Sequence, residues 1–174
     1  MASLGHVAVG LTAARISAGE RPSWPSITAW SALSLLPDSD VVGFSLGIPY
    51  GSAWGHRGAT HSLLFAAVVG AVVGLAAPRF GLRRIRTWLL ATAVVASHGL
   101  LDTLTTGGRG CALLWPFDLT RYFAPWRPIP VAPIGLDFLS PYGMFVAATE
   151  LVLFSPLVVF ALRRKTYTPS SGTR

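Results

Sequence analysis

Two of the four histidines lie five residues apart in the segment Gly-His-Arg-Gly-Ala-Thr-His-Ser, residues 55–62. Glycines on both sides of His56 and Arg57 indicate a tight loop, which leads directly into a long apolar run. Thr60 is a good helix N-cap, so we expect His61 in the first helical turn, where free N–H groups favour an anion. The guanidinium of Arg57 also suits phosphate or carboxylate. The segment predicts an anion site with two histidines; the alternative is a capped helix whose arginine contacts lipid headgroups.

His98 and Asp102 are four residues apart, a spacing that puts both side chains on one face of a helix. An imidazole and a carboxylate in this arrangement can bind one metal ion together. Both residues fall inside an apolar run, where ionisable side chains are costly and usually functional. The alternative is a hydrogen bond between them that joins two helices.

Asp38 and Asp40 follow Pro37 and flank Ser39. On a helix this spacing would turn the two side chains apart, but in a loop both carboxylates can point to one centre. Two close carboxylates hold a cation between them, or one of them stays protonated. The alternative is a solvated turn after a helix. His6, near the start of the chain, is a weaker candidate that depends on lying at the same level as the others.

Long apolar runs predict that helices in a membrane hold these residues. The chain of 174 residues is 52% hydrophobic and 12% charged, whereas an average soluble domain is roughly 25% charged. We expect an all-α integral membrane bundle of about five helices, with an aromatic-rich surface segment before the last helix. The predicted helices cover residues 4–18, 26–36, 60–77, 87–106 and 144–162, and the surface segment covers 107–142. The first two helices are short for a membrane span, which needs about 20 residues.

The basic residues predict how the bundle is oriented. Arginines gather after the third helix and, together with Lys165, after the fifth, as in cytoplasmic connections of membrane proteins. We therefore expect a multi-pass protein of the bacterial cytoplasmic (inner) membrane with a cytoplasmic C-terminus, built as one domain (1–165) and a disordered polar tail (166–174). This orientation brings seven ionisable residues to one level in the outer half of the bilayer. They are His6, Asp38, Asp40, His56, His61, His98 and Asp102.

The net charge, the single cysteine and the N-terminal segment each argue against a feature that the chain could otherwise have. The net charge of +7 does not indicate nucleic-acid binding, because the basic residues lie at the ends of apolar runs and form no solvated stripe. The single cysteine, Cys111, excludes an intrachain disulfide and a Cys-rich zinc site. We expect no cleavable signal peptide, since no basic residue precedes Arg15 and His6 interrupts the first apolar run.

Histidines and carboxylates without thiolates form a donor set typical of zinc, with manganese as the second choice. The six candidate ligands are His6, Asp38, Asp40, His61, His98 and Asp102. Because one tetrahedral zinc needs four ligands, the set allows two ions, or one ion with acid–base groups. The candidate catalytic residues are His56, Arg57 and Asp40, with His56 as the acid–base group and Arg57 holding an anionic substrate. Such a site suits the hydrolysis of a phosphoester.

Several short motifs are similar to those of one known family. They are His6, Leu-Pro-Asp-Ser-Asp at 36–40, His-Arg-Gly-Ala-Thr-His-Ser at 56–62, Ser-His-Gly-Leu-Leu-Asp at 97–102 with Thr105, Thr106 and Gly108, and Trp-Pro-Phe at 115–117. With these motifs the chain resembles, over about residues 1–165, the bacterial LexA-regulated, inner-membrane, predicted metal-dependent hydrolases. The resemblance implies an integral membrane hydrolase that uses a metal ion, and it defines no substrate.

The order of the candidate ligands is similar to that of a second group of enzymes. His, Asp, His and then His-x-x-x-Asp is also the ligand order of zinc-dependent phospholipase C and the related single-strand nucleases, which are soluble, all-helical, multi-zinc phosphodiesterases. This chain has no histidine after His98 to match their downstream ligands. The similarity adds support for phosphoester chemistry.

We therefore expect a membrane-bound, metal-dependent hydrolase that acts on a phosphoester, either a membrane lipid or a small molecule, at the outer leaflet. The alternative is a non-enzymatic membrane protein with a structural His/Asp cluster, either a lipid-binding scaffold or a metal or proton carrier. A carrier needs a polar path through both leaflets, whereas the inner halves of the last three predicted helices are almost wholly apolar.

Overall fold

The computed structural model describes residues 3–19 and 21–163, and in this part of the chain the regular elements are all helical. The α-helices are α1 (Ser3–Ala18), α2 (Trp24–Leu35), α3 (Val42–Ser45), α4 (Leu63–Ala76), α5 (Arg84–Thr103) and α6 (Pro141–Leu162). Four 3-10 helices join them: η1 (Leu36–Val41), η2 (Ala59–His61), η3 (Ala77–Phe80) and η4 (Gly135–Leu139). Apart from the one-turn α3, these are the five predicted helices, so the all-α prediction is confirmed. The predicted polar tail, 166–174, lies outside the described residues.

The start of α4 differs from the prediction. Ser62 has an extended backbone, and its hydroxyl accepts a hydrogen bond from the amide of Phe65 at 3.0 Å, so Ser62 is the N-cap. The hydroxyl of Thr60 instead donates to Asp40 at 2.7 Å. The predicted position of His61 in the first turn of this helix is therefore wrong, because His61 ends η2 before the N-cap.

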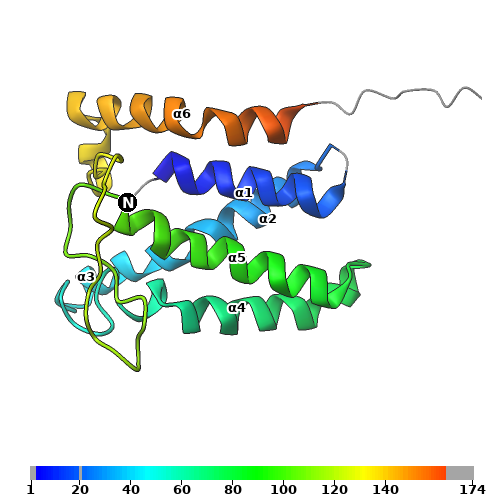
Figure 1. The fold of residues 1–174 in the computed structure, drawn as a ribbon, viewed down its shortest axis with the longest axis horizontal. Coiled ribbons are helices and arrows are strands. Elements are labelled where there is room, and N and C mark those ends of the chain that lie inside the picture. The colour runs from blue at the N-terminus through cyan, green and yellow to red at the C-terminus, as the bar shows by residue number, and fades with distance from the viewer. Residues whose placement is uncertain (1–2, 20, 164–174) are drawn as a thin grey trace, which may run out of the picture.

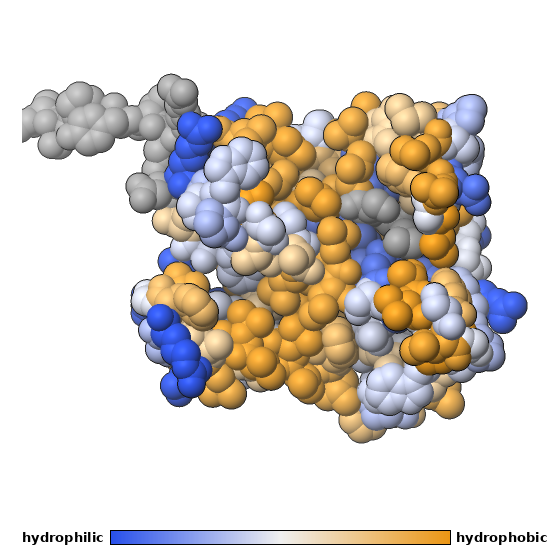
Figure 2. Space-filling model, turned by 180° about the vertical axis from the view of Figure 1, so that it is seen from behind, coloured by the Kyte–Doolittle hydropathy of each residue, from blue (hydrophilic) through white to orange (hydrophobic). Residues whose placement is uncertain are grey.

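Within residues 3–19 and 21–163, two segments are long and apolar enough to cross a membrane, Leu63–Phe80 (α4 with η3) and α6. Only 22% and 17% of the residues in their most apolar 18-residue stretches are buried inside the protein, so most of their apolar side chains are at least partly exposed. Figure 2 shows this apolar surface across the middle of the molecule, with hydrophilic side chains at both ends. By contrast α1 and α2, with 16 and 12 residues, reach only roughly 24 and 18 Å at 1.5 Å per residue.

The helices lie side by side in the order shown in Figure 1, with α6 and α4 on the outside. Helix α4 packs on α5, α1 packs on α2 and α6, and both α1 and α2 contact α5. Small residues allow the close approach. The core cluster includes Ala13, Ala14 and Ala91, packed with Trp30 and Val94.

The two ends of the bundle differ in character. The connections 46–58 and 104–140 gather at the end where α5 finishes and α6 begins (Figure 1). The described part of the second connection contains two isolated β-bridges, between Thr105 and Ile129 and between Cys111 and Tyr122. The opposite end carries arginines at the starts and ends of helices, including Arg15, Arg79, Arg83, Arg84, Arg86 and Arg163. Which end faces the cytoplasm stays a prediction.

Candidate metal centre

All four histidines meet at the loop-covered end of the bundle. The rings of His6 and His98 stack at 3.6 Å between centroids, His98 is edge-on to His61 at 4.8 Å, and His61 is edge-on to His56 at 5.5 Å. They come from α1, α5, η2 and the connection before η2. The predicted convergence of these residues at one level is therefore confirmed.

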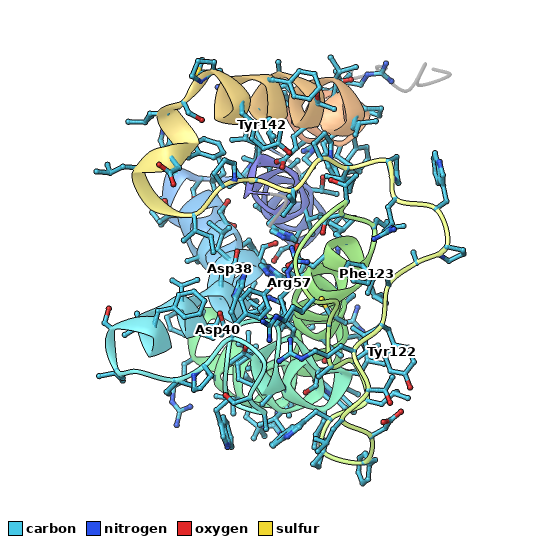
Figure 3. The ribbon with its side chains drawn as sticks, turned by 90° about the vertical axis from the view of Figure 1, so that its left-hand side faces the viewer. Asp38, Asp40, Arg57, Tyr122, Phe123 and Tyr142 are labelled. Atoms are coloured by element: carbon cyan, nitrogen blue, oxygen red, sulfur yellow. The ribbon has the colours of Figure 1, made fainter. Side chains whose placement is uncertain are left out.

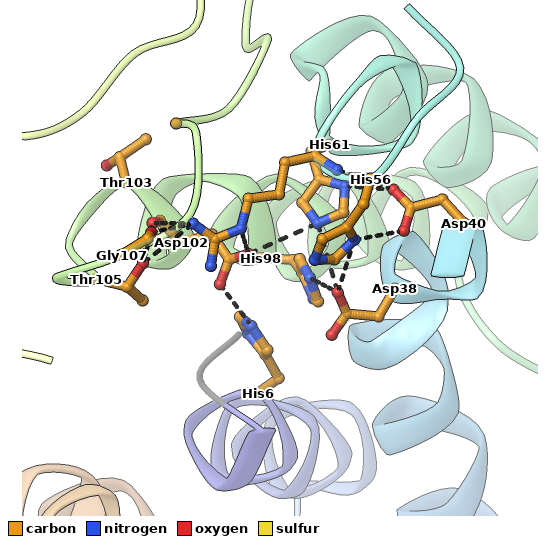
Figure 4. Close-up of polar contacts among 12 residues, drawn as sticks. His6, Asp38, Asp40, His56, His61, His98, Asp102, Thr103, Thr105 and Gly107 are labelled. Carbon is orange, nitrogen blue, oxygen red and sulfur yellow. Dashed lines mark hydrogen bonds and ion pairs between the residues drawn. The ribbon is translucent and has the colours of Figure 1, made fainter. Parts of the chain in front are cut away.

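In the described part of the chain, two groups of side chains are close enough to hold a metal ion. Asp38, His61, His98 and Asp102 each offer one ligand atom, and these atoms all lie within 4.8 Å of one another. Asp40 and His56 form a second group with the same His61. Figure 4 shows the two groups side by side, and Figure 3 shows Asp38, Asp40 and Arg57 together at the centre of this end.

The orientation of His98 is set by a backbone carbonyl. Its Nδ1 donates to the carbonyl oxygen of Ser34 at 2.7 Å, so Nε2 keeps a free lone pair in the neutral ring. This Nε2 lies 3.3 Å from Oδ1 of Asp38. Two acceptor atoms that face each other inside the protein need a proton or a cation between them. In a metal-bound histidine, the ring nitrogen that does not bind the metal usually donates to a carbonyl or carboxylate oxygen, as Nδ1 of His98 does here.

Asp40 holds the segment that carries the other two histidines. Its carboxylate accepts from Nδ1 of His56 at 2.7 Å, from the amide of Arg57 at 3.1 Å and from the hydroxyl of Thr60 at 2.7 Å. Nδ1 of His61 lies 3.2 Å away. Burial by itself raises the pKa of the Asp40 carboxyl, but the hydrogen bonds from His56 and His61 outweigh it and lower that pKa. Asp40 therefore acts as an ionised acceptor that orients both rings.

His61 is oriented like His98, with Nδ1 toward a fixed acceptor and Nε2 toward carboxylate oxygens. With Nδ1 directed to Asp40, its Nε2 faces Oδ1 of Asp38 at 3.6 Å and Oδ2 of Asp102 at 3.7 Å. Burial lowers the pKa of His61, but the hydrogen bonds with Asp38 and Asp40 outweigh it and raise that pKa. A proton on His61 and a metal ion therefore compete for the same lone pair.

Arg57 is buried and bonded within the protein. Its Nε lies 2.9 Å from Oδ2 of Asp102, and its Nη1 donates to Thr105 at 3.1 Å and to the carbonyl of Gly107 at 2.9 Å. The residue has a φ of 62°, a left-handed conformation uncommon outside glycine. These contacts anchor Asp102 and the turn after α5, whereas the predicted contact with an anionic substrate stays a prediction. His6 also contacts Asp102, with its Nε2 3.4 Å from Oδ1.

The cluster carries excess negative charge. Asp38, Asp40 and Asp102 contribute three negative charges and Arg57 one positive charge, which leaves −2 among the described residues when the histidines are neutral. All of these side chains are at most 9% exposed. One divalent cation would balance this charge, and so would two protons on the imidazoles.

A glycine lets α5 approach the histidine segment. A Cβ atom on Gly99 would lie 2.4 Å from the carbonyl oxygen of His61, so no larger residue fits without a shift. Gly58 is equally tight, since its Cβ would lie 2.3 Å from the carbonyl oxygen of Ala53. Gly99 thus lets α5 contact the segment of His61, and Gly58 lets the connection that carries His56 fold tightly on itself.

Several residues around the site had no signal in the sequence. Arg121 donates from Nη1 to the carbonyl of His56 at 3.0 Å and from Nη2 to that of Tyr50 at 3.1 Å, which braces the connection. The ring of Tyr50 is edge-on to His56 at 5.2 Å, and the guanidinium of exposed Arg109 lies 5.8 Å from the Tyr50 ring centre. An arginine in a loop does not reveal from sequence alone which carbonyls it will contact.

Glu150 holds the N-terminal end of α1. Its Oε2 accepts from the amides of Leu4 at 2.7 Å and Gly5 at 3.1 Å, and the side chain is fully buried. The carboxylate therefore caps α1 one residue before His6 and joins α6 to the helix that carries this histidine.

Comparison with known proteins agrees with this membrane architecture. The family model described as "YdjM inner membrane protein" matches residues 1–167. "Inner membrane protein YbcI" of Escherichia coli (strain K12) is 48% identical over 124 residues, which cover 69% of this chain and 70% of that protein. No solved structure matches the chain significantly.

Proposed function

Because the chain belongs to the YdjM inner membrane protein family and contains a buried His/Asp cluster, we propose that it is a membrane-embedded, metal-dependent hydrolase of phosphoesters. One observation carries the proposal. Nδ1 of His98 and Nδ1 of His61 face fixed acceptors, so both Nε2 atoms are directed at carboxylate oxygens in a site of net negative charge. This is the donor arrangement that a divalent cation requires.

The four-residue group supplies the ligands in this proposal. Asp38, His61, His98 and Asp102 match the nitrogen and oxygen donors that zinc prefers, and manganese accepts the same set. His6, beside Asp102 and stacked on His98, is a further ligand or a neighbour that fixes the His98 ring. When bound, a divalent ion acts as a Lewis acid on a phosphoryl oxygen and makes water a better nucleophile at neutral pH.

His56 is suited to proton transfer. Its Nδ1 donates to Asp40 at 2.7 Å, which fixes the tautomer and leaves Nε2 able to accept a proton from water and return it to the leaving oxygen. A carboxylate behind an imidazole orients the ring in this way in many hydrolases. We assign this orienting role to Asp40, which the sequence predicts as a catalytic residue.

The depth of the site favours a lipid substrate. The start of α1 lies beside Glu150, which is nine residues from the beginning of α6, or roughly 14 Å along a candidate span. The phosphoester of a membrane lipid can reach this level without leaving the bilayer. Exposed Arg109 beside Tyr50 is placed to attract its negative charge, whereas Nε and Nη1 of Arg57 are already occupied.

Metal content tests the proposal directly. We expect the detergent-purified protein to hold about one or two zinc or manganese ions per chain, measured by plasma mass spectrometry, and His98→Ala to hold almost none. Ser97→Ala is the matched control, because among the described residues the hydroxyl of Ser97 bonds only to the carbonyl of Val94, in its own helix. Equal metal content in His98→Ala and the control, or no stoichiometric metal in the wild type after reconstitution, would reject the metal centre.

Activity is tested separately from metal binding. His56→Ala should keep its metal but lose roughly 10²–10⁴-fold in the hydrolysis of a chromogenic phosphodiester or of phospholipid in micelles. Full activity in this variant would remove His56 from the mechanism. If the cluster holds no metal, the alternative of a non-enzymatic, lipid-binding scaffold is favoured. The apolar core of Ala13, Ala14 and Ala91 argues against the other alternative, a metal or proton carrier, which needs a polar path through the membrane.

A further inference from the structure

A second polar feature lies at the end of the bundle opposite the metal centre. A cavity of about 150 Å³ opens between the last turn of α1, the turn after η3 and the first two turns of α5. Ser17, Arg83, Arg86 and Thr87 supply its polar lining. None of these residues contributes to the His/Asp cluster, so the cavity requires its own explanation.

The cavity has two arginines with different surroundings. Nη2 of Arg86 donates to the carbonyl of Ile16 at 2.6 Å, which fixes this side chain at the C-terminal end of α1. The side chain of Arg83 is exposed, and its guanidinium has no hydrogen bond or ion pair with a described residue. Thr87 is only 6% exposed, and its hydroxyl likewise has no partner in the described part of the chain. Both groups are therefore free to bind a ligand in the cavity.

The charge of the cavity selects an anion. Its lining contains two arginines and no carboxylate. Among residues 3–19 and 21–163, the acids lie in the metal centre, in the loops at that end, or at Glu150 in α6. The backbone adds to this charge, because α5 begins here without a side-chain cap and directs its first N–H groups to this end.

The size and the flanks of the cavity identify the kind of anion. Pockets that enclose a whole drug-sized ligand measure about 300–1,000 Å³, so this one accommodates a small headgroup. Gly81, Leu82 and Leu90 complete its lining, and exposed Leu89 continues the apolar surface along α5. We propose that the cavity binds the phosphate of an anionic phospholipid, whose acyl chains lie against this apolar surface of α5.

Basic pockets between membrane helices are suited to such headgroups. The general excess of arginine on cytoplasmic connections accounts for charge at this end, but it does not account for a cavity with an unpaired arginine and a buried hydroxyl. In the predicted orientation the bound lipid belongs to the cytoplasmic leaflet, on the other side of the membrane from the proposed substrate. The inference therefore does not depend on the hydrolase activity.

The test compares two arginines that differ only in position. Arg83→Gln removes a cavity residue, whereas Arg79→Gln removes the same charge at the same end of the bundle from a residue outside the lining. Native mass spectrometry of the detergent-solubilised protein measures binding of phosphatidylglycerol and of phosphatidylcholine. We expect Arg83→Gln to weaken phosphatidylglycerol binding roughly fivefold, the effect of one basic residue near an anionic surface, and Arg79→Gln to change it less than about twofold.

Three outcomes would overturn the proposal. Wild-type affinity in Arg83→Gln would show that the cavity is not the lipid site. An equal loss in both variants would show that general charge attraction accounts for binding. Competition by inorganic phosphate at the concentration at which phosphatidylglycerol binds would identify a soluble anion as the ligand. Thr87→Val, which keeps the shape of the side chain, should also weaken binding if the hydroxyl contacts the phosphate.

Discussion

Arg57 and Arg83 lie at opposite ends of the same bundle and are used in opposite ways. Arg57 is 1% exposed, and its guanidinium contacts Asp102, Thr105 and Gly107. Arg83 is exposed, and its guanidinium pairs with no described residue. The two positions are separated by most of α5, roughly 27 Å between Arg84 and Asp102 at 1.5 Å per residue.

The difference follows from how charge is balanced. At the loop-covered end, buried carboxylates, imidazoles and one guanidinium neutralise one another in part, and a divalent cation would complete the balance. At the arginine-rich end, positive charge has no described counterpart and faces solvent or headgroups. The first arrangement is suited to chemistry on a bound substrate, and the second to attraction of an anion from outside.

The largest expected effect comes from removing the buried arginine. Arg57→Met takes away the 2.9 Å ion pair of Asp102, and breaking a buried pair costs about 3–5 kcal/mol of unfolding free energy. Arg83→Met should change that free energy by less than about 0.5 kcal/mol. Denaturant titration in detergent micelles, followed by circular dichroism, measures both. If both variants lost a similar amount of unfolding free energy, the two arginines would not differ in how they are bonded within the protein.

A tight glycine at each end sharpens the comparison. Alanine at Gly99 would place its Cβ 2.4 Å from the carbonyl oxygen of His61, and alanine at Gly74 would place its Cβ 2.5 Å from Cβ of Trp88. Both variants should lose about 1–3 kcal/mol of stability through overpacking. Only Gly99→Ala should also lose metal, because it displaces a ligand segment. Unchanged metal content in Gly99→Ala would mean that His61 is not a ligand.

A smaller effect is expected from the carboxylate that orients the histidines. Asp40→Asn keeps the size of the side chain but weakens its hydrogen bonds with His56 and His61, so metal affinity should fall about 10–100-fold. Competition with a chelating dye measures this affinity. Asp118→Asn, in the connection at the same end, is the control and should bind metal as the wild type does. Complete loss of metal in Asp40→Asn would make Asp40 a ligand itself.

The smallest effect is expected at the cap of α1. Glu150→Gln keeps an oxygen acceptor for the amides of Leu4 and Gly5 but removes its charge, which should cost about 1 kcal/mol. Glu150→Leu leaves both amides unpaired and should cost more. If both variants unfold at the wild-type denaturant concentration, Glu150 does not hold α1 in place.

Much of the fold could be predicted because it depends on local properties of the chain. Apolar runs between polar connections located all five helices within a few residues of their observed ends. The i, i+4 spacing of His98 and Asp102 placed both on one face of α5, and the arginine distribution placed all histidines at the other end. Membership in an inner membrane family agrees with the composition.

The details of the site could not be predicted, because they depend on contacts between distant residues. Thr60 is as good an N-cap as Ser62, and only the approach of Asp40, 20 residues earlier, shows that its hydroxyl is used elsewhere. The sequence also does not show that Arg57 contacts Asp102, 45 residues later, while its contact with an anionic substrate stays a prediction.

Sequence alone determined the helices, the membrane character and the set of residues that meet, since each follows from composition and spacing along the chain. Only the tertiary structure decided what each polar group does. The carbonyl of Ser34 that orients His98 is 64 residues away from it, and the amides capped by Glu150 are 145 and 146 residues away. A buried polar group must find a partner in three dimensions, and the sequence does not state which of many possible partners the packing brings within reach.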